Sequence, residues 1–398
     1  MLIKQTAYIS FDNILNLGFT FYITYFLTNN YGVQSVGEFT MLLSIYSVLF
    51  CLLNFSTQTS LRREVILERS SILRKHLLFE NIIFRVQYTL PISLIIFALI
   101  YNFSSNNNFF IYMYTFSIGI VNIFQAYLTT LESYQKIIIA RTIGIIIFVI
   151  SINAFEIVEV NFFYGMVSFQ AFFALLLLIA FSGPIQFRII ELSQFLNLLK
   201  KNLYFTFSGL VEVLILRYGV LFLGVAVTSS EIGFYAIANY FLMAANLIPL
   251  SFIKLYFNRY LRLLKSESLE LIRREFILFV IIAIGFSIIV LLSVMFFYKN
   301  LINIFFGITD NIATQYALFL SLYLPFLIIS RLLSYFLTAS GFSRQLFLTN
   351  LIMLANLIIF SILYYHFELY MSFILAMIQS ELIGILVNLG FLVKHKKI

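Results

Sequence analysis

Long, uninterrupted apolar runs are the feature that most limits the fold of this sequence. About 20 apolar residues suffice to cross a bilayer as a helix, and their continuity excludes a β-barrel, whose strands would alternate. Only 11% of the residues are charged, whereas a soluble domain has about 25%. We predict an all-α membrane protein with twelve transmembrane helices, at 8–28, 36–59, 77–101, 109–131, 137–155, 161–181, 203–227, 234–257, 276–298, 315–338, 346–365 and 369–393.

The basic residues predict the orientation of these helices. If the N-terminus is cytoplasmic, 21 of the 25 Lys and Arg side chains, Arg141 among them, fall in inner segments, one (Lys299) in an outer segment and three within spans. So strong a bias predicts that both termini lie in the cytoplasm, because inner loops carry the excess of Lys and Arg. The charge therefore indicates topology and contact with anionic lipid, and no nucleic-acid partner is expected. The long basic inner connections 60–76, 182–202 and 258–275 predict amphipathic helices at the membrane surface.

A weak internal repeat predicts two related halves. Ser35–Thr40 and Glu231–Ala236 each contain a Val/Ile-Gly-x-aromatic sequence that opens an apolar span, and their glycines lie 196 residues apart. Six spans precede the central connector and six follow it, so the halves insert in the same orientation. We predict two six-helix bundles, residues 1–190 and 191–398, related by a pseudo-two-fold axis along the membrane normal. Paired bundles of this kind place a substrate site between the repeats, open alternately to either side.

Charged residues inside the spans indicate where the chemistry lies. A charge at bilayer mid-depth costs about 2.5–3.5 kcal/mol even on the mildest insertion scale, so it faces a cavity or a partner. Near mid-depth we place Glu212, Arg217, Glu381 and, somewhat below them, Arg331; a buried structural ion pair such as Arg217–Glu381 is the alternative to a cavity. Three further charges near the cytoplasmic end can reach water by extending along the helix, namely Asp12, Glu80 and Arg85.

Short motifs resemble those of bacterial polysaccharide exporters. Glu231–Ala238 is similar to the turn before the eighth helix of the O-antigen (Wzx-type) flippases of the MOP superfamily, relatives of the MATE antiporters. Gly37–Phe39 with Arg62–Glu64 resembles their second helix and the following loop, and Thr338–Phe342 their tenth-to-eleventh helix region. Many members carry an acid directly before the arginine of the seventh helix, whereas this chain has Leu216 there.

The resemblance implies a function and a location. It implies a flippase in the bacterial inner membrane that moves undecaprenyl-pyrophosphate-linked oligosaccharide, an O-antigen or capsule repeat unit, to the outer leaflet. A polysaccharide polymerase and a chain-length regulator are its expected partners. The alternatives are a MATE-type cation or drug antiporter, which would favour acids over arginines in its cavity, and a membrane polymerase or glycosyltransferase. The short outer segments disfavour the last, and we expect no enzyme activity.

We assign roles to the charged residues on this basis. Guanidinium groups hold phosphate well, because their planar fork donates two parallel hydrogen bonds and keeps its charge when desolvated. The candidates for binding the pyrophosphate are Arg217, Arg331 and Arg85. The candidates for binding a coupling Na⁺ or H⁺ are Glu381, Glu212 and Asp12. No other cofactor and no structural metal is expected. Pro249 and Pro325 each remove a backbone hydrogen bond inside a span and are candidate hinges, with static kinks as the alternative.

Overall fold

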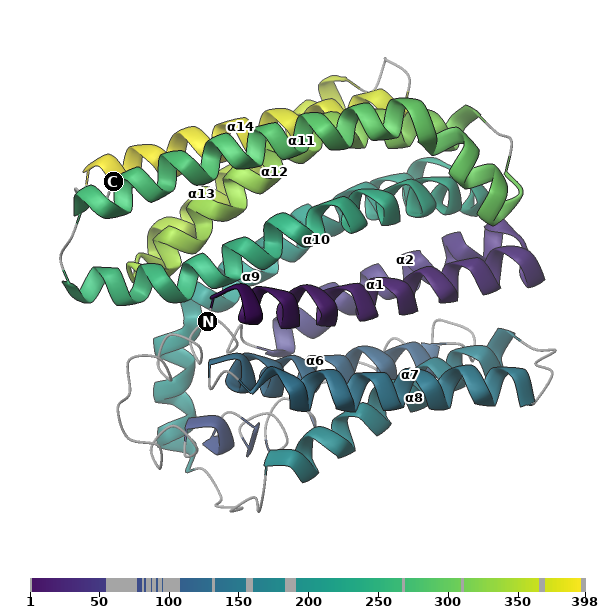
Figure 1. Ribbon diagram of the computed structural model, residues 1–398, viewed down its shortest axis with the longest axis horizontal. Coiled ribbons are helices and arrows are strands. Elements are labelled where there is room, and N and C mark those ends of the chain that lie inside the picture. Colours follow the sequence, from purple (N-terminus) through teal and green to yellow (C-terminus); the bar gives the residue numbers. More distant parts are fainter. Residues whose placement is uncertain are drawn as a thin grey trace. The chain divides into compact units, whose positions relative to one another are not determined.

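Every element that the structure describes is a helix (Figure 1). The structure is a computed structural model, and it describes residues 2–54, 77–80, 82–83, 87, 91, 95, 108–130, 133–154, 160–182, 191–266, 269–308, 311–364 and 369–394. The long helices are α1 Leu2–Tyr31, α2 Val33–Asn54, α6 Asn108–Thr130, α7 Tyr134–Ala154, α8 Val160–Ser182, α9 Leu192–Ala226, α10 Ser229–Ser266, α11 Leu269–Phe306, α12 Asn311–Ala339, α13 Ser343–Leu363 and α14 Leu369–Lys394.

These helices confirm the predicted all-α membrane fold. Each of the eleven covers one predicted span, and the remaining predicted span, 77–101, lies mostly outside the described residues. Within the described part of the chain, seven helical segments are long and apolar enough to cross a membrane by length and composition. The most apolar is Phe276–Phe306 on α11, of which only 12% is buried in the protein. Its apolar side chains therefore face outward, as expected where lipid replaces water as the solvent.

Glycines in the left-handed backbone conformation end three of the helices. Gly32 (φ 83°) separates α1 from α2, Gly307 (φ 64°) follows α11, and Gly341 (φ 82°) separates α12 from α13. A residue without Cβ adopts this conformation at little cost and stops a helix at its C-terminus. The backbone amides of Gly32 and Gly307 donate to carbonyls four residues earlier, which closes the last turn. The sequence therefore encodes these three helix ends locally.

The basic inner segments differ from the predicted surface helices. Residues 192–202 form the start of α9, and most of 258–275 is divided between the end of α10 and the start of α11. The segment 60–76 lies outside the described residues. Neither 192–202 nor 258–275 contains a Gly or Pro to interrupt it. The transmembrane helices therefore continue into their charged flanks instead of giving way to separate amphipathic helices.

Contacts divide the chain into two compact units. The first consists mainly of Ile3–Leu15 and Leu42–Val213, and the second of Asn16–Met41 and Leu214–Ile398. Three helices, α1, α2 and α9, contribute to both units. The two six-helix bundles with a boundary at residue 190 stay a prediction.

Each unit has its own packing. In unit 1, α8 packs against both α6 and α7, and the three run side by side (Figure 1). Their core includes Phe124, Ile137 and Leu178, each no more than 1% exposed. In unit 2, α12 contacts α10, α11 and α14, and α13 packs on α14. The helix α12 is therefore the centre of the second unit, and its side chains matter most for the site below.

A close helix contact in unit 2 gives a testable prediction about stability. A Cβ on Gly219 of α9 would overlap the Tyr235 hydroxyl and lie 2.8 Å from Tyr235 Cζ. That ring is 1% exposed and packs edge-on against Tyr316 and Phe373, so it has little room to yield. Overpacking of this kind costs about 1–3 kcal/mol. We expect Gly219→Ala to lower the thermal midpoint of the detergent-solubilised protein, whereas Gly18→Ala, with nothing within 4 Å, leaves it equal or higher. Equal midpoints for the two variants would contradict the close contact.

Candidate functional site

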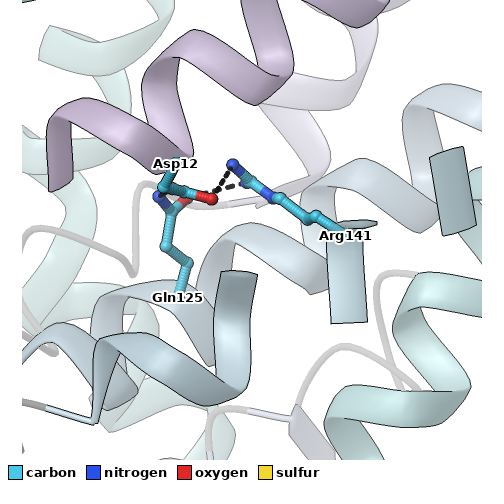
Figure 2. Close-up of polar contacts among 3 residues, drawn as sticks. All are labelled: Asp12, Gln125 and Arg141. Atoms are coloured by element: carbon cyan, nitrogen blue, oxygen red, sulfur yellow. Dashed lines mark hydrogen bonds and ion pairs between the residues drawn. The ribbon is translucent and has the colours of Figure 1, made fainter. Parts of the chain in front are cut away.

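A buried polar triad joins three helices of unit 1 (Figure 2). Arg141 Nη1 of α7 lies 2.7 Å from Asp12 Oδ1 of α1. Gln125 of α6 donates from Nε2 to Asp12 Oδ2 over 2.7 Å and accepts at Oε1 from Arg141 Nη2 over 3.2 Å. The three side chains form a closed ring of contacts in which both carboxylate oxygens are engaged. Asp12 is 5% exposed and Arg141 is 7% exposed, so the pair is shielded from water.

The triad changes how Asp12 is interpreted. Sequence reasoning placed Asp12 near enough to the cytoplasm to reach water and counted Arg141 among the inner basic residues; the structure buries both and pairs them. A coupling cation at Asp12 would have to displace a guanidinium that already neutralises it. The geometry therefore favours a structural ion pair at Asp12, and its assignment as a coupling residue stays untested.

A second polar cluster surrounds Glu381 of α14 in unit 2. The Tyr323 hydroxyl of α12 donates to Glu381 Oε1 over 2.8 Å, and the Ser330 hydroxyl and the Arg331 guanidinium also act on this carboxyl. Glu381 is 2% exposed, yet its Oε2 atom has no hydrogen-bond partner. A carboxylate oxygen without a partner in so dry a place is costly unless a proton or a cation binds it.

Other buried polar atoms in unit 2 also have no hydrogen-bond partner. Asn388 is 0% exposed, and neither its Nδ2 nor its Oδ1 atom has a hydrogen-bond partner. It lies seven residues after Glu381, which places both side chains on one helix face. On α13, the Thr349 hydroxyl is also 0% exposed without such a partner. Unit 2 thus contains buried polar groups on α13 and α14 with unused hydrogen-bonding capacity.

The predicted arginines occupy different surroundings. Arg331 is the basic neighbour of Glu381. Sequence reasoning had instead named Arg217 as the possible ion-pair partner of Glu381. Arg217 is partly buried on α9 and acts electrostatically on the buried Tyr235 of α10. The third predicted arginine, Arg85, lies outside the described residues. The structure thus gives Arg217 and Arg331 separate partners in unit 2, and their role toward a phosphate stays a prediction.

The structure locates the remaining predicted residues, and their predicted roles stay predictions. Glu212 is partly buried on α9 within unit 1, and Glu80 is also partly buried. Pro249 and Pro325 lie inside α10 and α12, which continue past them in both directions. Both prolines are thus accommodated within unbroken helical spans, and their use as hinges stays a prediction.

Comparison with solved structures defines the class of fold. No protein-family model matches the chain, and no curated protein matches it in sequence. Solved structures match over its whole length, and they are transporters of the MATE group and the wider MOP superfamily. The chain therefore has the all-helical fold of these transporters.

Three of these structures illustrate the likeness. A mutant of the Vibrio cholerae MATE transporter VcmN has a TM-score of 0.73 at 16% identity, over 99% of this chain and 96% of that chain. A MOP superfamily transporter from Pyrococcus furiosus has a TM-score of 0.73 at 14% identity, over 100% and 96%. The MATE multidrug transporter DinF-BH has a TM-score of 0.70 at 12% identity, over 100% and 95%. At these identities the likeness establishes the fold and leaves the cargo open.

Proposed function

We propose that this protein is a secondary transporter that moves its cargo across the membrane by ion-coupled alternating access. The observation that carries the proposal is the whole-length match to MOP superfamily transporters at TM-scores near 0.7. The solved relatives named above are transporters, so an activity without chemical conversion of the cargo is the simplest expectation. The excess of basic residues in inner segments supports a multi-pass protein with both termini in the cytoplasm, and the resemblance of its motifs to polysaccharide exporters suggests the bacterial inner membrane.

The best candidate for the coupling residue is Glu381. Its carboxyl is almost fully buried, has one oxygen without a hydrogen-bond partner and is held by Tyr323 through the other. An ionisable residue in such a place is functional by default, because its desolvation must be offset by a partner or a bound ion. A proton or Na⁺ at Oε2 would satisfy the free oxygen while Arg331 balances the charge of the cluster. Asp12 is a weaker candidate, since Arg141 and Gln125 occupy both of its oxygens.

The cargo best supported by the comparisons is an organic cation or drug. Two of the similar solved structures are named for multidrug transport or multidrug resistance, and several others are named as MATE transporters. This export activity was the alternative hypothesis from the sequence, and it now becomes the leading one.

A lipid-linked oligosaccharide is the second candidate cargo. It is favoured by Arg217 and Arg331, because buried guanidinium groups suit pyrophosphate better than they suit a cation. The P. furiosus transporter is described as having a binding pocket of reverse polarity that suggests a different function. A polysaccharide polymerase and a chain-length regulator would then be the expected partners.

Reconstitution into liposomes separates the two cargoes. We expect an imposed pH or Na⁺ gradient to drive ethidium movement in protein-containing vesicles at a rate well above that in empty vesicles. The matched assay follows a fluorescent polyprenyl-pyrophosphate saccharide between leaflets by dithionite quenching. Movement of the saccharide without ethidium transport would replace the first cargo with the second, and movement of neither under any gradient would contradict the proposed function.

A further inference from the structure

The turns that open α2 and α10 are equivalent in structure as well as in sequence. Adding the 196-residue spacing to Val33, the first residue of α2, gives Ser229, the first residue of α10. The turn hydrogen bonds match too, since Ser35 N donates to Gly32 O over 3.2 Å and Glu231 N to Thr228 O over 3.1 Å. The weak sequence repeat therefore marks a real structural repeat at these two turns.

The two equivalent turns pack on each other through their glycines. A Cβ on Gly37 would overlap the Ser229 carbonyl oxygen and lie 3.1 Å from Gly233 N. A Cβ on Gly233 would overlap the Val33 carbonyl oxygen. Each glycine thus meets the residue four positions before the other glycine, so the contact is reciprocal. Such a contact has local two-fold symmetry, and only glycine permits backbones to approach so closely.

This crossing lies within unit 2, although α2 continues into unit 1. The halves of α1 and α2 that flank it, Asn16–Met41, group with the C-terminal helices, whereas Ile3–Leu15 and Leu42–Asn54 group with the N-terminal ones. The first two helices are thus held to the C-terminal helices at the end that carries the crossing. That end lies away from the N-terminus and, under the predicted topology, on the outer side of the membrane.

We propose that the Gly37–Gly233 crossing is the outer gate of the transport pathway, shut in this structure. The inference rests on the proposed transport function, because a gate needs a pathway. The crossing closes the outer end by direct backbone packing, with Val36 and Ile232, a repeat-equivalent pair that is 0% and 2% exposed, sealed beside it. Release of cargo to the outer side requires α2 and α10 to part here. A methyl group on either glycine prevents the close approach and shifts the protein toward the open state.

Cysteine labelling in intact vesicles tests the gate without any cargo. Val36→Cys or Ile232→Cys is introduced with Cys51→Ala and treated from outside with a membrane-impermeant maleimide. With both glycines present we expect both probes to be labelled at least about tenfold more slowly than Gln34→Cys, an exposed position on α2. Gly37→Ala and Gly233→Ala should each accelerate labelling of both probes about tenfold, and the matched Gly18→Ala should leave it unchanged. Unchanged labelling in folded alanine variants, or equal acceleration by Gly18→Ala, would overturn the gate.

A second measurement avoids variants that fail to fold. With both native glycines retained, an imposed ion gradient that drives turnover should raise the labelling of Val36→Cys and leave Leu320→Cys, 0% exposed in the core of α12, protected. Equal protection of Val36→Cys with and without the gradient, in vesicles that transport cargo, would refute the gate alone. If the vesicles transport neither cargo, the proposed function fails, and the response of the labelling to the glycine substitutions still reports on the crossing.

Discussion

Arg141→Ala should destabilise the protein by about 3–5 kcal/mol, the range seen when one partner of a buried ion pair is removed. The substitution leaves the Asp12 carboxylate at 5% exposure with Gln125 as its remaining partner in the triad. Because the carboxylate sits on α1 and its partners on α6 and α7, the loss should loosen the packing of α1 within unit 1. The measurement is the thermal midpoint of unfolding in detergent, supported by the fraction that remains monodisperse.

Two further variants control this experiment. Lys136 on the same helix is exposed and donates to Phe181 O over 2.9 Å, so Lys136→Ala should cost no more than about 1 kcal/mol. The double variant Asp12→Asn with Arg141→Gln removes both charges and keeps polar groups in place, and it should be more stable than Arg141→Ala. A loss for Arg141→Ala no larger than that for Lys136→Ala would mean that the triad contributes little to stability.

Glu381→Gln should uncouple transport from the driving ion. The glutamine amide keeps an acceptor for the Tyr323 hydroxyl but cannot carry the charge that faces Arg331. Binding of one ligand commonly changes the affinity for a coupled ligand by about 5- to 150-fold. We expect the variant to lose an acceleration of this size by the ion gradient, while movement of cargo down its own gradient persists. The measurement is the ratio of transport rates with and without the ion gradient in proteoliposomes.

Tyr323→Phe is the matched control for Glu381→Gln. It removes one hydrogen bond and keeps the carboxylate, so stability should fall by about 1 kcal/mol and coupling should be largely retained. If Glu381→Gln keeps the full response to the gradient, Glu381 is a structural residue and the coupling site lies elsewhere. Loss of coupling in both variants to the same degree would point to packing of the cluster instead of its charge.

The sequence predicted the fold because the signals for it are local. Apolar length locates a helix wherever it packs, and a glycine with positive φ ends α1, α11 and α12 at predicted loops. The repeat was also visible, since Gly37 and Gly233 show the same spacing as the first residues of α2 and α10. The basic flanks were misread as separate helices because amphipathic composition does not reveal whether a helix is interrupted.

The partners of the charged residues could not be predicted in the same way. Arg141 was counted as cytoplasmic because its place in the chain is close to a predicted span end, whereas the structure buries it against Asp12 of α1, 129 residues earlier in the sequence. One signal was available: Asp12 lies ten residues into α1 and Arg141 seven into α7, so the two lie at comparable depth. The choice of Arg331 over Arg217 beside Glu381 depends on how α12 packs against α14, which no spacing within one helix encodes.

The central claim is that an ion and a cargo move through this fold in one coupled cycle, and simultaneous recording of both movements tests it most directly. Purified protein is placed in liposomes that contain a pH-sensitive dye and, in a parallel series, a Na⁺-sensitive dye, and ethidium or the lipid-linked saccharide is then added. We expect one of the two ions to cross the membrane only after one of the cargoes is added, and we expect Glu381→Gln to abolish this dependence. Ion movement that ignores both cargoes, or cargo movement that ignores both ions, would contradict it.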